Sequence, residues 1–160
     1  MAAYPFEEPL RSLLHEFKYQ EGLYLGSFLA TLIIKNIPAE ALTTECLIPV
    51  PLHPKRIQQR GFNQAAELVK HLSKALKLPY GLSFCKKIIN TIPQAELSAK
   101  ARGNNLTEAF YSNPVPYQHV TIVDDLITTG STINALAKTL KQQGVKCVDV
   151  WCCARVTINH

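Results

Sequence analysis

The stretch VTIVDDLITTGSTI (residues 120–133) joins a run of β-branched residues to two adjacent carboxylates and then to a hydroxyl-rich turn. Its near-continuous apolar start predicts a strand over residues 120–125 that is buried on both faces, as in a parallel sheet. The sequence STINALAKTLKQQG (131–144) then predicts a helix that ends at its final glycine. Asp124 and Asp125 would therefore lie at the carboxyl end of a strand, where open α/β sheets bind their ligands.

The rest of the chain continues this alternation of strands and helices. Short apolar runs predict strands at residues 46–50, 82–89 and 145–156, and Asn63 can cap a helix that follows the first of them. The inward face of this helix would consist of Ala65, Leu68, Val69, Leu72 and Leu76. Such alternation is typical of an α/β fold with a parallel sheet and right-handed crossovers.

Two helices are predicted before the first strand, at residues 8–19 and 23–36. We expect them to form a small N-terminal helical cap over residues 1–45, packed on a core of residues 46–160. The chain has 160 residues, of which 47% are hydrophobic and 18% charged, a composition that suits one globular domain. The 17 basic and 12 acidic residues leave a net charge of +5, which permits an anionic ligand such as a phosphate or a nucleic acid.

The cysteines favour a reduced, cytoplasmic protein. Their number is odd, no two are spaced as C-x-x-C, and no histidine pair completes a zinc pattern, so no zinc is expected in this chain. The five are Cys46, Cys85, Cys147, Cys152 and Cys153. The most apolar window, residues 23–34, is shorter than the ~20 residues of a membrane-spanning helix, so no membrane insertion is expected.

The residues around the acidic pair suggest a ligand with two chemically different parts. The loop hydroxyls and the free N–H groups of a helix N-terminus can bind a phosphate, and Gly130 lets the backbone approach it closely. The hydroxyls belong to Thr128, Thr129, Ser131 and Thr132. Because carboxylates repel phosphate but accept hydrogen bonds from sugar hydroxyls, the pattern suits a ribose 5-phosphate. The alternative is an ordinary capped helix after a βα turn.

Other nucleotide-binding patterns fit this chain less well. It contains neither G-x-x-x-x-G-K-[ST] nor G-x-G-x-x-G. A phospho-receiver domain also has an acidic pair after a strand, but it places that pair early in the chain. Too few residues follow Asp125 to supply the second aspartate and the lysine that a receiver needs.

The segment VTIVDDLITTGST resembles the phosphoribosyl-pyrophosphate (PRPP) binding motif of type I phosphoribosyltransferases. The resemblance implies the central parallel sheet of that family flanked by helices, PRPP as ligand and Mg²⁺ as cofactor. It also implies that Asp124 and Asp125 contact the ribose hydroxyls. The 5-phosphate would be held by Thr128, Thr129, Gly130, Ser131 and Thr132.

A second signature is similar to the ComF competence-protein family, a branch of these transferases. It consists of IPVPLHPKRIQQRGFNQA (48–65), the pattern Q-x-x-L-x-x-x-x-R-x-x-N at residues 94–105, and FKYQ near the N-terminus. The likeness spans about residues 4–155. ComF proteins usually begin with a Cys-rich zinc module that this sequence does not contain, so this member lacks it or the chain starts after it.

The basic loop that follows strand 46–50 is the candidate pyrophosphate site. It carries His53, Lys55, Arg56 and Arg60, and arginine can grip phosphate with two hydrogen bonds. A solvated basic loop is the alternative. We expect residues 93–108 to close over the ligand as a flap, with Arg102 at the departing pyrophosphate, although a plain surface loop would have the same composition.

The resemblance thus implies a Mg²⁺-dependent phosphoribosyltransferase that transfers the pentosyl group to a nitrogen nucleophile, with Asp124, Asp125 and Arg102 as catalytic residues. The alternative is a non-catalytic module that binds PRPP or single-stranded DNA for competence-machinery partners, where Phe62, Tyr111 or Trp151 could stack on bases if they are not in the core. A homodimer is common among related folds. The sequence names neither the acceptor nor a general base.

Overall fold

The structure of the chain is a computed structural model that describes residues 1–89 and 109–156. The predicted flap over residues 93–108, including Arg102, lies outside the described residues.

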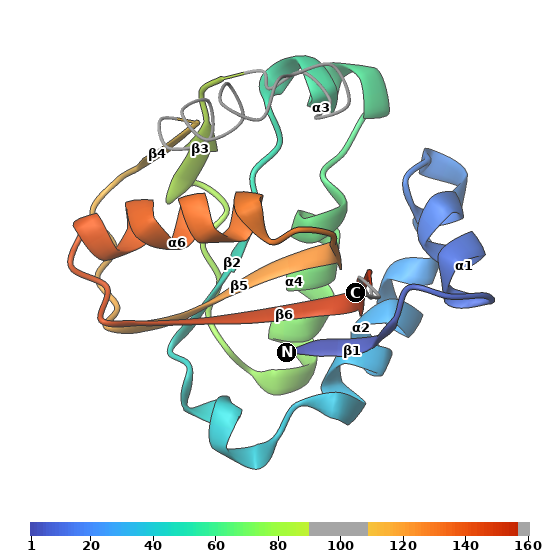
Figure 1. The fold of residues 1–160 in the computed structure, drawn as a ribbon, viewed down its shortest axis with the longest axis horizontal. Helices are drawn as coiled ribbons and strands as arrows, with labels where there is room; N and C mark the ends of the chain where they lie inside the picture. Colours follow the sequence, from blue (N-terminus) through green and yellow to red (C-terminus); the bar gives the residue numbers. More distant parts are fainter. Residues whose placement is uncertain (90–108, 157–160) are drawn as a thin grey trace.

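Four parallel strands form the central sheet of the described part, in the order β1-β6-β5-β2 (Figure 1). They are β1 (Ala2–Pro5), β2 (Cys46–Pro49), β5 (His119–Ile127) and β6 (Cys147–Arg155). The strand predicted from VTIVDD is β5, which lies between β2 and β6. The predicted α/β fold with a parallel sheet is confirmed.

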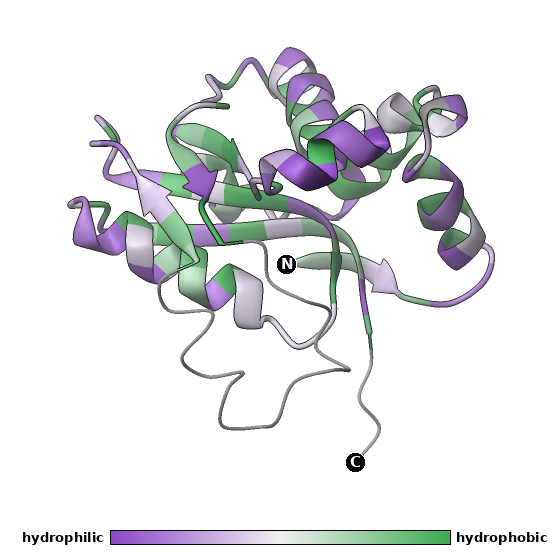
Figure 2. Cartoon of the chain, turned by 90° about the horizontal axis from the view of Figure 1, so that it is seen from above, coloured by the Kyte–Doolittle hydropathy of each residue, from purple (hydrophilic) through white to green (hydrophobic). Residues whose placement is uncertain are grey.

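Helices cover both faces of this sheet, and the strand residues alternate between the two helical layers. On one face, Ile122 of β5 packs with α6 (Ser131–Gln142). On the other face, Val123 packs with α2 (Leu25–Asn36) and α4 (Gln64–Leu76). Figure 2 shows mainly hydrophobic residues along the strands, whereas hydrophilic and hydrophobic residues alternate around the helices. The sheet is therefore buried on both faces, as its apolar runs predicted.

The strand predicted at residues 82–89 is shorter in the structure, and it lies outside the central sheet. The structure has β3 (Cys85–Lys87), which pairs antiparallel with β4 (Phe110–Ser112) in a separate two-stranded sheet. Tyr80 makes a single parallel bridge to β2, and the chain then turns away at Gly81, where the ring of Phe84 occupies the space of a Cβ. This turn keeps β3 out of the central sheet, and the sequence did not predict β4.

The N-terminal region contributes to the sheet as well as to the helical layer. β1 was not predicted, and it pairs in parallel with β6. The two predicted helices are shorter than expected: they are α1 (Leu10–Phe17) and α2, separated by the short helix η1 (Gln20–Gly22). A further short helix, η2 (Ala39–Thr43), precedes β2. Because α2 packs on the sheet and β1 extends it, residues 1–45 are more than a helical cap.

The polar segment after β2 was expected to be a loop, but it contains α3 (Pro54–Arg60). His53 caps this helix by accepting a hydrogen bond from the backbone N–H of Lys55, at 3.3 Å. Pro54 occupies the first helical position, and Gly61 ends the helix with a left-handed φ of 85°. Proline at the start and glycine at the end are the usual helix boundaries, so the signals were present in the sequence.

The structure contains the five cysteines as free thiols, and all of them except Cys147 are buried. Across residues 1–89 and 109–156, none of the helices combines the length and the apolar character needed to cross a bilayer.

Candidate functional site

A pocket of about 270 Å³ lies at the carboxyl ends of β2 and β5. Both members of the acidic pair line it, together with basic side chains from three other elements. Its charged and hydroxyl-bearing lining residues are Lys18, His53, Arg56, Arg60, Lys87, Asp124, Asp125 and Thr132. The pocket therefore combines two carboxylates with a cationic wall, which suits a ligand that has both hydroxyls and phosphates.

The acidic pair is placed by the alternation of β5, so its two side chains leave opposite faces of the strand. The backbone N–H of Asp125 donates a 2.9 Å hydrogen bond to Oδ1 of Asp124. Burial and the neighbouring charge of Asp125 raise the pKa of Asp124 well above its usual value, while Lys18 opposes this shift. Oδ2 of Asp125 is buried and has no hydrogen-bond partner among the described residues. The described residues therefore do not fully replace the hydrogen bonds to water that these two carboxylates lose on folding.

The hydroxyl-rich loop joins β5 to α6. Gly130 has a left-handed φ of 81°, which glycine adopts freely, and nothing lies within 4 Å of a Cβ built there. Thr129 and Ser131 share a 2.9 Å hydrogen bond between their hydroxyls, and Thr132 reaches the pocket wall. The first turn of α6, which is described in full, carries no acidic side chain. Its N–H groups are thus suited to an anion.

The pocket takes its cationic wall mainly from α3. Arg56 and Arg60 are one helical turn apart, so both side chains fall on the face that lines the pocket, next to His53. Lys55 is exposed on another face of α3 and is not among the lining residues. The structure thus brings three of the four predicted pyrophosphate residues to the acidic pair, and it places Lys55 outside.

Two lysines complete the wall, and neither was singled out from the sequence. Lys18 follows α1, and Lys87 ends β3. Burial and the nearby charge of Arg56 lower the pKa of Lys87, whereas Asp124 raises it. Lys87 also lies 5.8 Å from the centre of the Phe110 ring. Lys18 belongs to the FKYQ segment, which was the available signal, while the position of Lys87 depends on the unpredicted pairing of β3 with β4.

The aromatic residues considered for base stacking have different environments. Trp151 is in the core, with 1% of its surface exposed, and cannot stack on a base. Phe62 is half-buried, with its ring 6.3 Å from that of Phe17. Tyr111 is 52% exposed, so it lies outside the core and its ring is accessible. The position of Arg102 lies outside the described residues.

A central parallel sheet flanked by helices, with an acidic pair at its carboxyl edge and a hydroxyl-rich loop before the next helix, defines a type I phosphoribosyltransferase-like fold. The Phosphoribosyl transferase domain family matches residues 57–157. Competence protein F of Haemophilus influenzae is 40% identical over 92% of this chain and 69% of that protein. The chain therefore belongs to the ComF family of phosphoribosyl transferase domain proteins.

A further relative agrees with this assignment, and a solved structure agrees with the fold. DNA utilization protein YhgH of Escherichia coli is 35% identical over 94% of this chain and 69% of its own length. The glutamine PRPP amidotransferase from B. subtilis, complexed with ADP and GMP, superposes on 86% of the chain with a TM-score of 0.55 and 15% identity. The chain spans only 30% of that enzyme, so this likeness concerns the fold alone.

Proposed function

We propose that this protein binds PRPP together with Mg²⁺ and transfers the 5-phosphoribosyl group to a nitrogen nucleophile, in a process linked to competence or DNA utilization. The main support is one pocket that is lined both by the carboxylate pair, of which Asp125 is buried and Asp124 half-buried, and by the cationic side chains of α3. The names of the relatives, competence protein F and DNA utilization protein YhgH, support the biological setting.

Each part of the ligand has a matching part of the pocket. The carboxylates of Asp124 and Asp125 accept hydrogen bonds from the ribose hydroxyls. The loop from Thr128 to Thr132 and the N–H groups of α6 hold the 5-phosphate. Arg56 and Arg60 bind the pyrophosphate by paired, charge-assisted hydrogen bonds. Lys18 and Lys87 add positive charge around it, and His53 lines the same wall of the pocket.

The carboxylate pair also fits a magnesium ion. Mg²⁺ prefers oxygen ligands and keeps several waters, so one or two carboxylates suffice to hold it. The buried Oδ2 of Asp125 lacks a partner within the described residues, which leaves it available to the ion or to its water shell. Asp124 and Asp125 would hold the metal, which would neutralise charge on the pyrophosphate.

In the transfer step, the bond between the anomeric carbon and a pyrophosphate oxygen breaks, and its electron pair leaves with the pyrophosphate. The ribose ring then carries positive charge that resembles an oxocarbenium ion. The carboxylates of Asp124 and Asp125 stabilise that charge, and the arginines of α3 stabilise the charge on the leaving group. The nitrogen nucleophile bonds to the anomeric carbon through its lone pair, and its proton passes to solvent water.

A second candidate function is single-stranded DNA binding without turnover. It is supported by the pairing of exposed Lys86 on β3 with exposed Tyr111 on β4, which sets a cation beside an aromatic ring. Such pairs can hold a phosphate and a stacked base. Loss of DNA affinity in Tyr111→Ala, together with a salt-dependent affinity in the unmodified protein, would support this function.

Calorimetric titration with PRPP, with and without Mg²⁺, tests the main proposal. We expect Mg²⁺-dependent binding that is lost when Asp124→Asn and Asp125→Asn are combined. Arg56→Ala and Lys55→Ala form a matched pair, since both remove a charge from α3 but only Arg56 lines the pocket. We expect Arg56→Ala to weaken binding roughly tenfold or more, and Lys55→Ala to leave it nearly unchanged.

Unchanged PRPP affinity in the double aspartate variant would overturn the assignment of the pocket. Binding without release of pyrophosphate in the presence of a panel of nitrogen bases would retain PRPP as the ligand and remove the transfer step.

A further inference from the structure

A second cluster of reactive side chains lies at the amino ends of β5 and β6, whereas the acidic pair lies near the carboxyl end of β5. His119 begins β5, Cys147 begins β6, and Asp149 follows two residues later. One potential ligand atom from each of the three lies within 4.8 Å of the other two. Because His119 pairs with Cys147 and Thr121 pairs with Asp149, all these side chains leave the same face of the sheet.

The three side chains together form a typical ligand set for a zinc-like ion. Imidazole nitrogen, thiolate sulfur and carboxylate oxygen all bind Zn²⁺ at ~2.0–2.3 Å, which places ligand atoms of one ion roughly 4 Å or less apart. Nε2 of His119 and Oδ2 of Asp149 are already 2.8 Å apart. Small side-chain rotations would therefore bring all three onto one ion, with a water in the fourth position.

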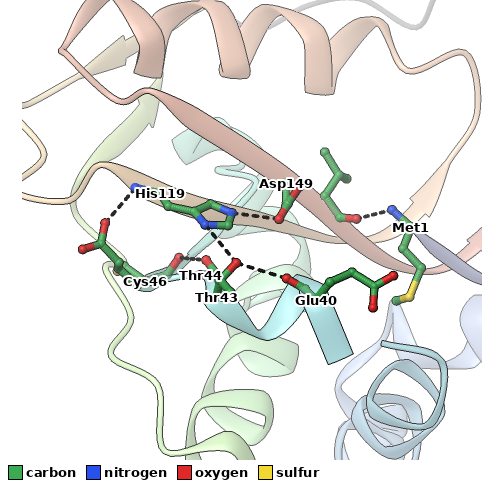
Figure 3. A network of polar contacts seen from close by, with 9 residues as sticks. Met1, Glu40, Thr43, Thr44, Cys46, His119 and Asp149 are labelled. Atoms are coloured by element: carbon green, nitrogen blue, oxygen red, sulfur yellow. Dashed lines mark hydrogen bonds and ion pairs between the residues drawn. The ribbon is translucent and has the colours of Figure 1, made fainter. Parts of the chain in front are cut away.

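The histidine has the outer support that metal-binding histidines usually have. Thr43 Oγ1 lies 3.5 Å from the other ring nitrogen, Nδ1, and donates its own hydrogen bond to the carbonyl of Glu40 at 3.1 Å (Figure 3). The hydroxyl is thus left to accept a hydrogen bond from Nδ1–H. In the structure Nε2–H donates to Oδ2 of Asp149, and a metal would displace that proton and bind both atoms. The Glu45 carboxylate holds the start of β5 by accepting hydrogen bonds from the backbone N–H groups of Gln118 and His119, both at 2.7 Å.

Two other roles for this cluster explain less of its geometry. A Cys-His-Asp nucleophile would need the thiol at one ring nitrogen and the carboxylate at the other. Here Thr43 approaches Nδ1 and Asp149 contacts Nε2, so neither nitrogen is placed to take a proton from Cys147. A simple ion pair between His119 and Asp149 would not involve Cys147, which is the exposed thiol among the five cysteines.

We propose that His119, Cys147 and Asp149 form a binding site for a zinc-like divalent ion, separate from the PRPP pocket. The ion fastens the first residues of β5 and β6 together and shields the exposed thiol from oxidation. The sequence led us to expect no zinc, because no two cysteines are spaced as C-x-x-C and no histidine pair completes a zinc pattern. The ligands come from two paired strands instead, and spacing along the chain does not report that pairing.

Metal titration of the untagged, chelator-stripped protein tests the site. We expect one equivalent of Zn²⁺ to bind in competition with a chromogenic chelator, and Co²⁺ to give a thiolate-to-cobalt charge-transfer band. Cys147→Ser should abolish that band, and His119→Gln and Asp149→Asn should each weaken binding about tenfold or more. His15→Gln, which changes an exposed histidine on α1, should leave the affinity unchanged.

A thiol-reactivity measurement on the unmodified, folded protein gives an independent readout. Without metal, a water-soluble disulfide reagent should modify Cys147 quickly and the four buried thiols slowly. Zn²⁺ should slow the fast phase about tenfold or more in the unmodified protein but not in Asp149→Asn. Equal Zn²⁺ affinity in the unmodified protein and in Cys147→Ser, or an unprotected fast thiol at saturating Zn²⁺, would overturn the proposal.

Discussion

Asp124 is held in a folded environment that disfavours its charge. Its pKa is raised by burial and by the adjacent Asp125, so the folded protein prefers the protonated form. A group of this kind contributes stability below its unfolded pKa, and that contribution is lost as the pH rises toward the folded pKa. At neutral pH, above the unfolded pKa, the unfavourable environment of the carboxylate therefore destabilises the fold, and this cost is reduced when a cation binds to it.

Asp124→Asn should stabilise the protein near neutral pH. Removal of the buried charge is expected to raise the free energy of unfolding by on the order of 1 kcal/mol, which corresponds to roughly 2–4 °C in Tm. The gain should disappear at acidic pH, where Asp124 of the unmodified chain is protonated. Thermal unfolding at several pH values measures this, and the exposed Glu40→Gln is the control. A loss of stability at neutral pH would contradict the charge argument.

The same pKa shift predicts how PRPP affinity depends on pH. Binding of Mg²⁺ and of ribose hydroxyls requires ionised carboxylates, and protonation of Asp124 begins at a higher pH than for an ordinary aspartate. We expect affinity to fall as the pH is lowered from 8 toward the raised pKa. Inorganic pyrophosphate, which should contact the arginines and not the carboxylates, controls for titration of the phosphates. Parallel pH profiles for both ligands would contradict the role of Asp124.

For single residues, the sequence predicted the chemical suitability of a side chain better than it predicted where that side chain lies in the structure. Asp124, Asp125, Arg56 and Arg60 were proposed because their side chains suit a phosphorylated sugar, and the structure places them around one pocket. Lys55 has the same chemistry as its neighbour Arg56, and only the angular position on α3 separates them. That position could not be derived while the segment was expected to be a loop.

Individual elements hold the pocket residues in place, and α4 depends strongly on its cap. Asn63 Oδ1 accepts hydrogen bonds from the N–H groups of Ala65 and Ala66 at 3.0 and 3.4 Å. Its Nδ2 donates to the carbonyl of Val50 at 3.0 Å. One side chain therefore starts α4 and ties it to the end of β2, next to the pocket.

Asn63→Ala should lower the free energy of unfolding by about 1–2 kcal/mol, because both the cap and the bond to Val50 are lost. Asn63→Asp keeps the capping oxygen and removes only the donor. Its free energy of unfolding should therefore lie between that of Asn63→Ala and that of the unmodified protein. Denaturant unfolding of the three proteins measures the effect. Equal stability of Asn63→Ala and the unmodified protein would show that the cap does not stabilise α4.

The elements that were predicted have long periodic patterns, and those that were missed are short. β5, α4 and α6 follow clear apolar periods and strong caps. β1 and β4, with four and three residues, are too short for periodicity to identify. Both exist because a neighbouring strand supplies hydrogen bonds, which is a tertiary effect that local sequence does not encode.

For the whole molecule, ligand binding should appear as increased stability. A ligand at 100 times its Kd that binds only the folded state adds about 2.7 kcal/mol, and this would raise Tm by several degrees. We expect PRPP with Mg²⁺ to produce this increase in the unmodified protein and in Lys55→Ala. It should be absent when Asp124→Asn and Asp125→Asn are combined, and an equal increase in that double variant would place PRPP elsewhere.

The overall architecture was predictable because the alternation of strands and helices permits few topologies. The order of strands in the sheet was not predictable in full. β1 lies beside β6, and nothing in the first five residues indicates that they pair with residues 152–155. The contact between His119 and Asp149, at the amino end of the strands, depends likewise on a strand pairing, in this case that of β5 with β6.

The position of β6 between β1 and β5 has a consequence for how the chain is made. Ala2 pairs with Cys152, so β1 has no partner in the sheet until β6, about 150 residues further along the chain, has been synthesised. Contacts of such long sequence separation slow folding, and unpaired strand edges invite aggregation. A chain that stops before residue 147 leaves β1 and one edge of β5 without a neighbour. Such fragments are expected to be bound by chaperones or degraded rather than to persist as partly folded proteins.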